Sequence, residues 1–173
     1  MKSLIEYLIP YKGLSIGKHE YEFHVQDSFF AALESASIEG GDLKASLVLD
    51  KQSRLMIAEI KIVGTIKLAC DRCMELFDFA IDVEYEQIYK YGDAPEINED
   101  DIIYLNNTEY QIDVSILILE NILLEIPIRR IHPEDKQGNS TCNPKHIELI
   151  QSYGKKKQVD PRWDVLKNLK FED

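Results

Sequence analysis

The sequence predicts an α+β fold, in which an antiparallel β-meander packs against a central apolar helix and short C-terminal helices follow. Two observations carry this prediction: apolar and polar residues alternate with period two over residues 42–90, and a mostly apolar segment of helical length occupies residues 114–126. We expect residues 1–173 to form a single domain, because a chain of this length can bury one core without disulfides.

The N-terminal part is expected to contribute one strand and one short helix. The stretch "KHEYEFHV", residues 18–25, alternates enough for a strand. The stretch "DSFFAALES" then predicts a helix with Asp27 as its N-cap, and Gly40-Gly41 marks its end.

Three strands joined by short turns are expected next. The pattern divides "RLMIAEIKIVGTIKLA", residues 54–69, into an apolar face that includes Ile60 and Ile62 and a more polar face that includes Glu59 and Lys61. The following strand, residues 75–91, alternates aromatic or aliphatic residues with acidic ones. Much of the acidic middle of the chain is therefore expected to be the solvated face of the sheet.

The second half is expected to be mainly helical. A small hairpin is predicted around Asn106-Asn107, and Asp113 is expected to cap the apolar helix, which Pro127 ends. We expect Leu123 to be buried against the sheet. The polar positions of this helix are expected to form a narrow stripe made of Glu120, Asn121 and Glu125. Two short helices should follow, "PKHIELIQSYG" and one that begins after Asp160.

Charge is unevenly distributed in this acidic chain. The net charge is −11, and residues 67–112 carry three Lys/Arg against twelve Asp/Glu. An acidic protein does not bind nucleic acid by bulk attraction, so contact with phosphate should use the late basic residues. The candidate RNA-binding residues are Arg129, Arg130, Lys155, Lys156, Lys157 and Arg162. The alternative is that the lysine run is an ordinary solvated loop.

The composition also predicts a cellular compartment. Three cysteines and an N-terminus without a hydrophobic signal region indicate a reducing, cytoplasmic setting. The longest apolar tract is interrupted by Glu120, Asn121 and Glu125, so no membrane span is expected.

The pair Cys70 and Cys73 suggests a metal half-site. In a hairpin, residues that flank a two-residue turn lie about 5 Å apart and point the same way, which suits thiolates converging on zinc. Redox chemistry of the thioredoxin type is less favoured, because it needs a helix N-terminus beside the thiol and both flanks here are strands. Cys142 and His132 complete a possible Cys3His zinc site. The alternative is that the cysteines are small, semi-buried turn residues and His132 is a surface histidine.

No catalytic constellation is visible. The sequence has no Gly-rich phosphate loop, GxSxG or HExxH, so we expect neither an enzyme nor a small-molecule substrate. The acidic run Glu99 to Asp101 is expected to be a solvated loop.

Several short stretches, in order, resemble the YceD family of bacterial and plastid proteins. These are "CDRCMELF", the apolar helix ending "LLEIPIRRIHP", the following Cys142 and the terminal "DPRWDVLKNLK", over about residues 42–170. Many relatives have a second CxxC-like cluster after the helix, where this chain keeps only Cys142.

The resemblance implies a non-enzymatic factor that supports accumulation or assembly of the large-subunit (23S) rRNA. Two mechanisms remain open. The basic residues could contact rRNA directly, or the acidic surface around residues 93–101 could hold a basic ribosomal protein until delivery. A zinc- or redox-responsive module built on Cys70 and Cys73 is a third possibility.

Overall fold

The protein is an α+β molecule built on one long sheet, as the sequence predicts. The computed structural model describes residues 4–92, 102–106 and 108–154. The sheet has the order β2-β3-β4-β5-β6, formed by Gly17–Gln26, Gly40–Lys51, Leu55–Ala69, Leu76–Tyr91 and Ile102–Leu105. The other elements are η1 (Leu4–Tyr7), β1 (Leu8–Ile9), η2 (Tyr11–Gly13), α1 (Asp27–Ala32), β7 (Ile112–Asp113), α2 (Ser115–Glu125) and α3 (Pro144–Gly154).

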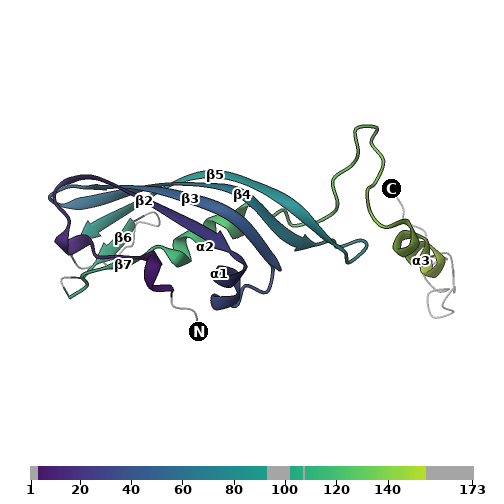
Figure 1. Ribbon diagram of the computed structural model, residues 1–173, viewed down its shortest axis with the longest axis horizontal. Helices are drawn as coiled ribbons and strands as arrows, with labels where there is room; N and C mark the ends of the chain where they lie inside the picture. Colours follow the sequence, from purple (N-terminus) through teal and green to yellow (C-terminus); the bar gives the residue numbers. More distant parts are fainter. Residues whose placement is uncertain (1–3, 93–101, 107, 155–173) are drawn as a thin grey trace, which may run out of the picture.

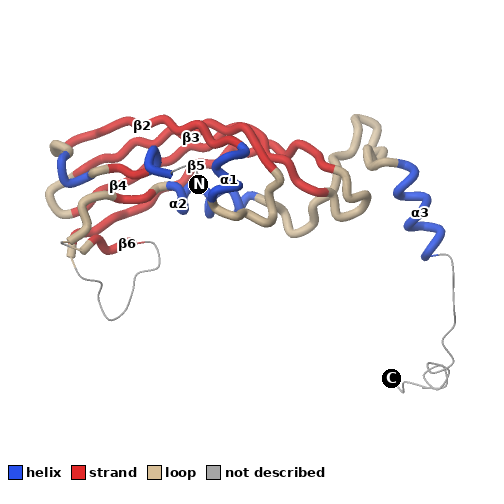
Figure 2. The backbone as a smooth tube through the Cα atoms, turned by 60° about the horizontal axis from the view of Figure 1, so that its bottom comes forward, coloured by secondary structure: helices blue, strands red, loops and turns tan. Residues whose placement is uncertain are grey.

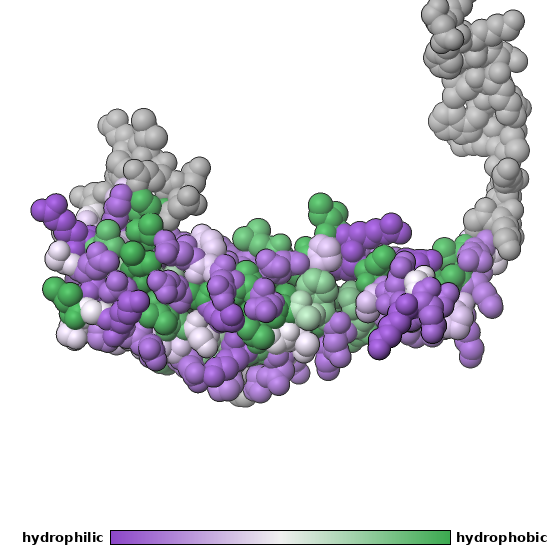
Figure 3. Space-filling view, turned by 90° about the horizontal axis from the view of Figure 1, so that it is seen from above, coloured by the Kyte–Doolittle hydropathy of each residue, from purple (hydrophilic) through white to green (hydrophobic). Residues whose placement is uncertain are grey.

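The predicted meander is confirmed: β2, β3, β4 and β5 pair antiparallel in chain order. Helices α1 and α2 lie on one face of this sheet, and the hairpin of β4 and β5 extends beyond them (Figure 1, Figure 2). The alternation of apolar and polar residues determines which face of the sheet is buried, because successive side chains of a strand point to opposite faces. In β4, Ile60 and Ile62 are buried toward the helices while Glu59 and Lys61 are exposed. The outer face, seen in Figure 3, carries many hydrophilic side chains.

Gly64 allows β3 and β4 to approach closely. Its φ of +152° is one that side-chain-bearing residues rarely adopt. A β-carbon there would lie 2.3 Å from the carbonyl oxygen of Asp42 and 2.6 Å from the α-carbon of Leu43. The close pairing of β3 and β4 at this position therefore requires a residue without a side chain.

Helix α2 packs against β5 and ends just before Pro127, as expected. Its buried face includes Ile118 and Ile122. Two expectations are wrong. Leu123 is 37% exposed, and Asn121 is buried, where its side-chain amide donates a hydrogen bond of 2.8 Å to the carbonyl of Leu117. The buried asparagine is tolerated because its helix supplies an acceptor.

The expected caps differ in detail. Asp27 is the first residue of α1 rather than its N-cap, and its carboxylate accepts a hydrogen bond of 2.9 Å from the amide of Gly41. Gly40-Gly41 begin β3, and α1 ends earlier, at Ala32. Val114 occupies the N-cap of α2, but the carboxylate of Asp113 accepts hydrogen bonds from the amide and the hydroxyl of Ser115, at 2.9 and 2.6 Å.

The hairpin predicted around Asn106-Asn107 is wrong. Strand β6 pairs in parallel with the end of β5, Ile88 opposite Ile102, and β7 pairs with β1. Asn107, the acidic run of residues 93–101 and the helix expected after Asp160 lie outside the described residues, so the predictions for residues 93–101 stay predictions. Helix α3 confirms the helix predicted in "PKHIELIQSYG".

The buried apolar residues form two separate groups. The larger group fills the space between the sheet, α1, α2 and the N-terminal segment. The smaller group contains Cys70, Cys73 and Cys142, with Phe77, Ile131 and Ile147 packed against it, at the far end of the β4–β5 hairpin. Among the helices of the described ranges, none is long and apolar enough to cross a membrane.

Candidate metal centre at the end of the long hairpin

The loop that joins β4 to β5 places its two cysteines on the same side. Ala69 pairs with Leu76, so the connection has six residues, Cys70 to Glu75, and the expected two-residue turn is wrong. Within it, the amide of Met74 donates to the carbonyl of Cys70 at 2.8 Å, and Met74 itself has a φ of +62°. This tight fold directs both thiols inward, where the side chains of Cys70 and Cys73 are almost fully buried.

The structure brings together the four residues expected to form a Cys3His site. The ligand atoms of Cys70, Cys73, His132 and Cys142 all lie within 4.8 Å of one another. The sulfurs of Cys70 and Cys142 are 3.8 Å apart. Nδ1 of His132 lies 3.4 Å from the sulfur of Cys73 and 3.8 Å from that of Cys142.

These separations match a tetrahedral zinc site. With Zn–S bonds of about 2.3 Å and Zn–N bonds of about 2.0–2.1 Å, tetrahedral angles place two sulfurs about 3.8 Å apart and a sulfur and a nitrogen about 3.5–3.6 Å apart. The sulfur–sulfur separation is far longer than the S–S bond of about 2.05 Å in a disulfide. The donor set and its spacing therefore fit a closed, structural zinc site.

Apolar contacts enclose the cluster. The ring of Phe77 lies 5.1 Å from the imidazole of His132, measured between centroids, and Ile131 and Ile147 pack against the cysteines. Phe77 comes from β5, Ile131 from the loop after α2, and Ile147 from α3. Three separate segments of the chain thus exclude water from the thiols.

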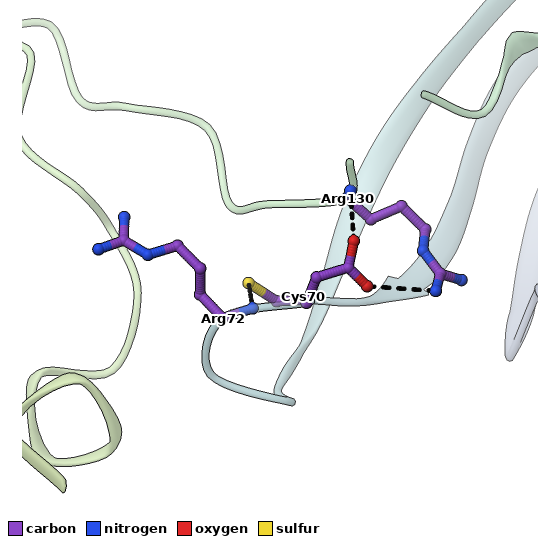
Figure 4. A network of polar contacts seen from close by, with 4 residues as sticks. Cys70, Arg72 and Arg130 are labelled. Carbon is purple, nitrogen blue, oxygen red and sulfur yellow. Dashed lines mark hydrogen bonds and ion pairs between the residues drawn. The ribbon is translucent and has the colours of Figure 1, made fainter. Parts of the chain in front are cut away.

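Hydrogen bonds favour a thiolate at Cys70. Burial alone would raise the pKa of this thiol, but backbone amides of Cys73 and Arg72 and a contact from His132 outweigh it and lower the pKa to about 6. The amide of Arg72 lies 3.4 Å from the Cys70 sulfur (Figure 4). Burial and the neighbouring sulfur of Cys70 raise the pKa of Cys73, as expected when two thiols share one site without a metal.

A second layer of contacts holds the loops that carry these ligands. The carboxylate of Asp71 accepts a hydrogen bond of 2.7 Å from the amide of Arg130 and pairs with its guanidinium at 3.2 Å (Figure 4). The imidazole of His146 donates to the carbonyl of Cys73 at 2.6 Å, and the side-chain amide of Asn143 donates to the carboxylate of Glu75, also at 2.6 Å. Sequence reasoning missed these contacts, because they join segments about sixty or more residues apart.

The predicted basic residues are not brought to this site as a group. Arg130 is engaged with Asp71, while Arg129 is exposed. Lys155, Lys156, Lys157 and Arg162 lie outside the described residues, so the RNA-binding prediction for them stays a prediction.

Fold and site together define a class: an α+β protein in which a β-meander carries a cysteine–histidine cluster at the end of its longest hairpin. A family model described as "Large ribosomal RNA subunit accumulation protein YceD" matches residues 58–170. The chain belongs to the YceD family. The match begins within β4 and covers all four residues of the cluster.

One curated relative is the "Uncharacterized protein YlbN" of Bacillus subtilis (strain 168). It is 26% identical to this chain over 125 residues, which cover 72% of each protein. No solved structure matches the chain. The family description ties this chain to the large ribosomal RNA subunit and leaves the partner open.

Proposed function

We propose that the protein is a non-enzymatic assembly factor of the large ribosomal subunit that supports accumulation of 23S rRNA by holding a basic assembly partner on its acidic sheet. One observation carries this proposal: Glu59 of β4 and Glu86 of β5 are paired directly opposite each other on the outer face. Like charges in that position are destabilising. A cationic partner would offset the repulsion.

Neighbouring residues also indicate that the outer face can attract a cationic partner. Lys61 forms an ion pair with Glu84, so one of the acidic residues of β5 is already neutralised. Asp82 faces Val63 and Glu86 faces Glu59, and neither has a cation opposite it in the sheet. The surplus negative charge of the outer face therefore lies on β5, with Glu59 of β4 beside it.

We further propose that Cys70, Cys73, His132 and Cys142 hold one structural zinc ion. The support is the donor set, its burial and its near-tetrahedral spacing. Zinc would fix the loop after α2 and the start of α3 to the tip of the hairpin, and would stabilise its cysteine ligands as thiolates.

The zinc proposal is tested by metal analysis of purified protein. We expect about one zinc per chain, and Cys73→Ser should lose most of it and lower the melting temperature. His146→Gln is the matched control, since His146 contacts the carbonyl of Cys73 from outside the ligand set and its loss should leave the metal in place. Metal-free wild-type protein, with unchanged melting for Cys73→Ser, would reject the zinc site.

The assembly proposal is tested in cells that lack the gene. The variant Glu59→Gln with Glu86→Gln removes both negative charges and keeps the side-chain shape. We expect it to restore 23S rRNA and large-subunit levels less well than wild type, as read by RNA quantification and sucrose gradients. Its melting temperature should be equal or higher, because the repulsion is gone. Full restoration by this variant would contradict a role for the acidic face.

Direct contact with rRNA is the second candidate, favoured by the rRNA in the family description and by the exposed Arg129. Replacing Lys155, Lys156 and Lys157 by Gln should then weaken binding to 23S rRNA fragments. The dependence of log affinity on log salt should also flatten by about 2–3 units, because each phosphate contact releases a counterion. If this variant binds rRNA as wild type does, direct recognition by the basic residues is wrong.

A further inference from the structure

Strand β5 has an open edge along most of its length. It has sixteen residues, Leu76–Tyr91, and pairs with β4 on one side from Leu76 to Lys90. On the other side β6 pairs only with Ile88 to Tyr91. Within the described ranges, no strand pairs with the remaining edge, residues 76–86. Unpaired strand edges expose amides and carbonyls that another extended chain can use.

An apolar surface borders this edge on the helix side. Ile60 and Ile62 of β4 are buried, whereas their partners in β5 are not: Val83 is half-buried and Tyr85 is 37% exposed. Helix α2, which packs against β5, exposes Ile116 and Leu124. The apolar layer of the sheet therefore continues to Val83 and Tyr85 at its edge, where it is less covered than in β4.

An acidic surface borders the same edge on the outer side. The exposed outward-facing residues of β5 include Asp78, Asp82, Glu84 and Glu86. Lysines of β4 face Asp78 and Glu84 in the pairing, but Asp82 and Glu86 have none opposite them. A strand added beside β5 would thus meet negative charge on one face and apolar side chains on the other.

The opposite edge of the sheet, formed by β2, differs in this respect. Its inward-facing Phe23 and Val25 are 7% and 0% exposed and Tyr21 is half-buried, so the apolar border is better covered there than at Tyr85. The carbonyl of His24 accepts a hydrogen bond of 3.2 Å from the hydroxyl of Tyr7, so part of that strand is covered by η1. Of the two edges, β5 has the more exposed apolar border and the larger number of exposed acidic residues.

We propose that residues 76–86 of β5 bind an extended segment of a basic protein by strand addition, with cationic residues of the segment alternating with apolar ones. Main-chain hydrogen bonds to the edge would supply binding, and the alternating side chains would supply selectivity. The cations would lie over Asp82 and Glu86, and the apolar side chains would contact Tyr85 and the exposed face of α2. This inference rests on the proposed function and names the way in which its partner is held.

The test uses a fluorescein-labelled peptide of twelve residues in which lysine and valine alternate, and the full-length protein. We expect saturable binding by fluorescence anisotropy and at least tenfold weaker binding for Asp82→Lys with Glu86→Lys. Glu20→Lys with Glu39→Lys is the matched control: it changes the net charge equally, at exposed residues away from β5, and should weaken binding by less than threefold. Melting temperatures close to that of the wild-type protein would establish that both variants are folded.

Backbone pairing is separated from charge attraction by a second peptide, N-methylated at alternate positions, with the same charge. It should bind at least tenfold more weakly, and only the unmodified peptide should slow hydrogen exchange of the amides in residues 76–86. Equal binding of the methylated peptide, equal loss in both charge variants, or protection of this edge by a twelve-nucleotide RNA in place of the peptide would each overturn the proposal.

The same variants distinguish this inference from the proposed function. If Asp82→Lys with Glu86→Lys abolishes peptide binding yet restores 23S rRNA in cells, strand addition at this edge is wrong as the partner-binding mode while a role in assembly stands. If wild-type protein binds the peptide but cells that lack the gene have unchanged rRNA levels, the assembly role is wrong and the peptide-binding edge stands.

Discussion

Tyr7 is a single residue at which pH and stability are coupled. Burial, with a smaller effect from Glu6, raises its pKa from 10.0 to about 12. The unfolded chain therefore ionises first as pH rises, so the stabilisation is complete below pH 10 and is lost as pH rises toward 12. Unfolding monitored by circular dichroism should show stability falling over this interval, and more gently in Tyr7→Phe.

The same substitution has an effect near neutral pH. It removes the hydrogen bond from the tyrosine hydroxyl to the carbonyl of His24, which should cost about 0.5–1.5 kcal/mol at pH 7. A variant with an unchanged slope between pH 10 and 12 would show that Tyr7 is not the source. Burial also raises the pKa of Tyr89, so the stability of the variant should still fall to some extent as the pH rises above 10.

The residues of the candidate site could be predicted from sequence because cysteine and histidine are typical zinc ligands and this chain has only three cysteines and four histidines. Two cysteines three apart can only converge if the chain turns between them, and His132 and Cys142 lie in a loop long enough to reach them. The supporting pair of Asp71 and Arg130 carried no such signal. Acidic and basic residues make up 29% of this chain, so the sequence does not single out this pair among the many possible ones.

Helix α2 provides a test of burial at the scale of one element. Ile122 is fully buried in the core between helix and sheet, so Ile122→Ala should cost about 2–5 kcal/mol in the free energy of unfolding, measured in urea. Leu124, two positions on and 80% exposed, is the matched control and should change stability by less than about 0.5 kcal/mol. Equal effects would mean that the helix is rotated about its axis.

Strand β4 should be intolerant of a side chain at Gly64. A methyl group would approach the Asp42 carbonyl far inside contact distance, in a backbone conformation that alanine rarely adopts. Gly64→Ala should therefore lower the free energy of unfolding by about 1–3 kcal/mol or more. Gly13→Ala, at a glycine with no atom near its hypothetical β-carbon, should change it by much less. Equal values would show that β3 and β4 can separate at little cost.

The elements differ in how well the sequence predicted them. Strands β3, β4 and β5 are long, so many alternating positions specify each of them. Strands β6 and β7 have four and two residues, too few for a periodic signal, and the Asn-Asn pair between them indicated a hairpin. Their real partners, β5 and β1, are set by long-range packing.

For the whole molecule, two separate apolar groups predict two levels of stability. The distal group holds the cysteines and is small, whereas the main group contains most of the buried residues. If the cysteine–histidine cluster holds zinc as proposed, removing the zinc with a chelator should speed hydrogen exchange in residues 70–75 and 130–150 by at least tenfold. Amides of β2, β3 and the core half of β4 should keep their protection. Uniform loss of protection would show that the two ends unfold together.

The length of the β4–β5 hairpin has a hydrodynamic consequence. Fifteen residues of β4 at about 3.3 Å each extend about 50 Å, along the long direction of Figure 1. Such a body spins about its long axis faster than it turns end over end. Because ladder N–H bonds stand across the strands, that spinning reorients them most efficiently. Their nitrogen-15 relaxation should therefore report a shorter apparent correlation time than N–H bonds aligned with the axis, in one and the same rigid molecule.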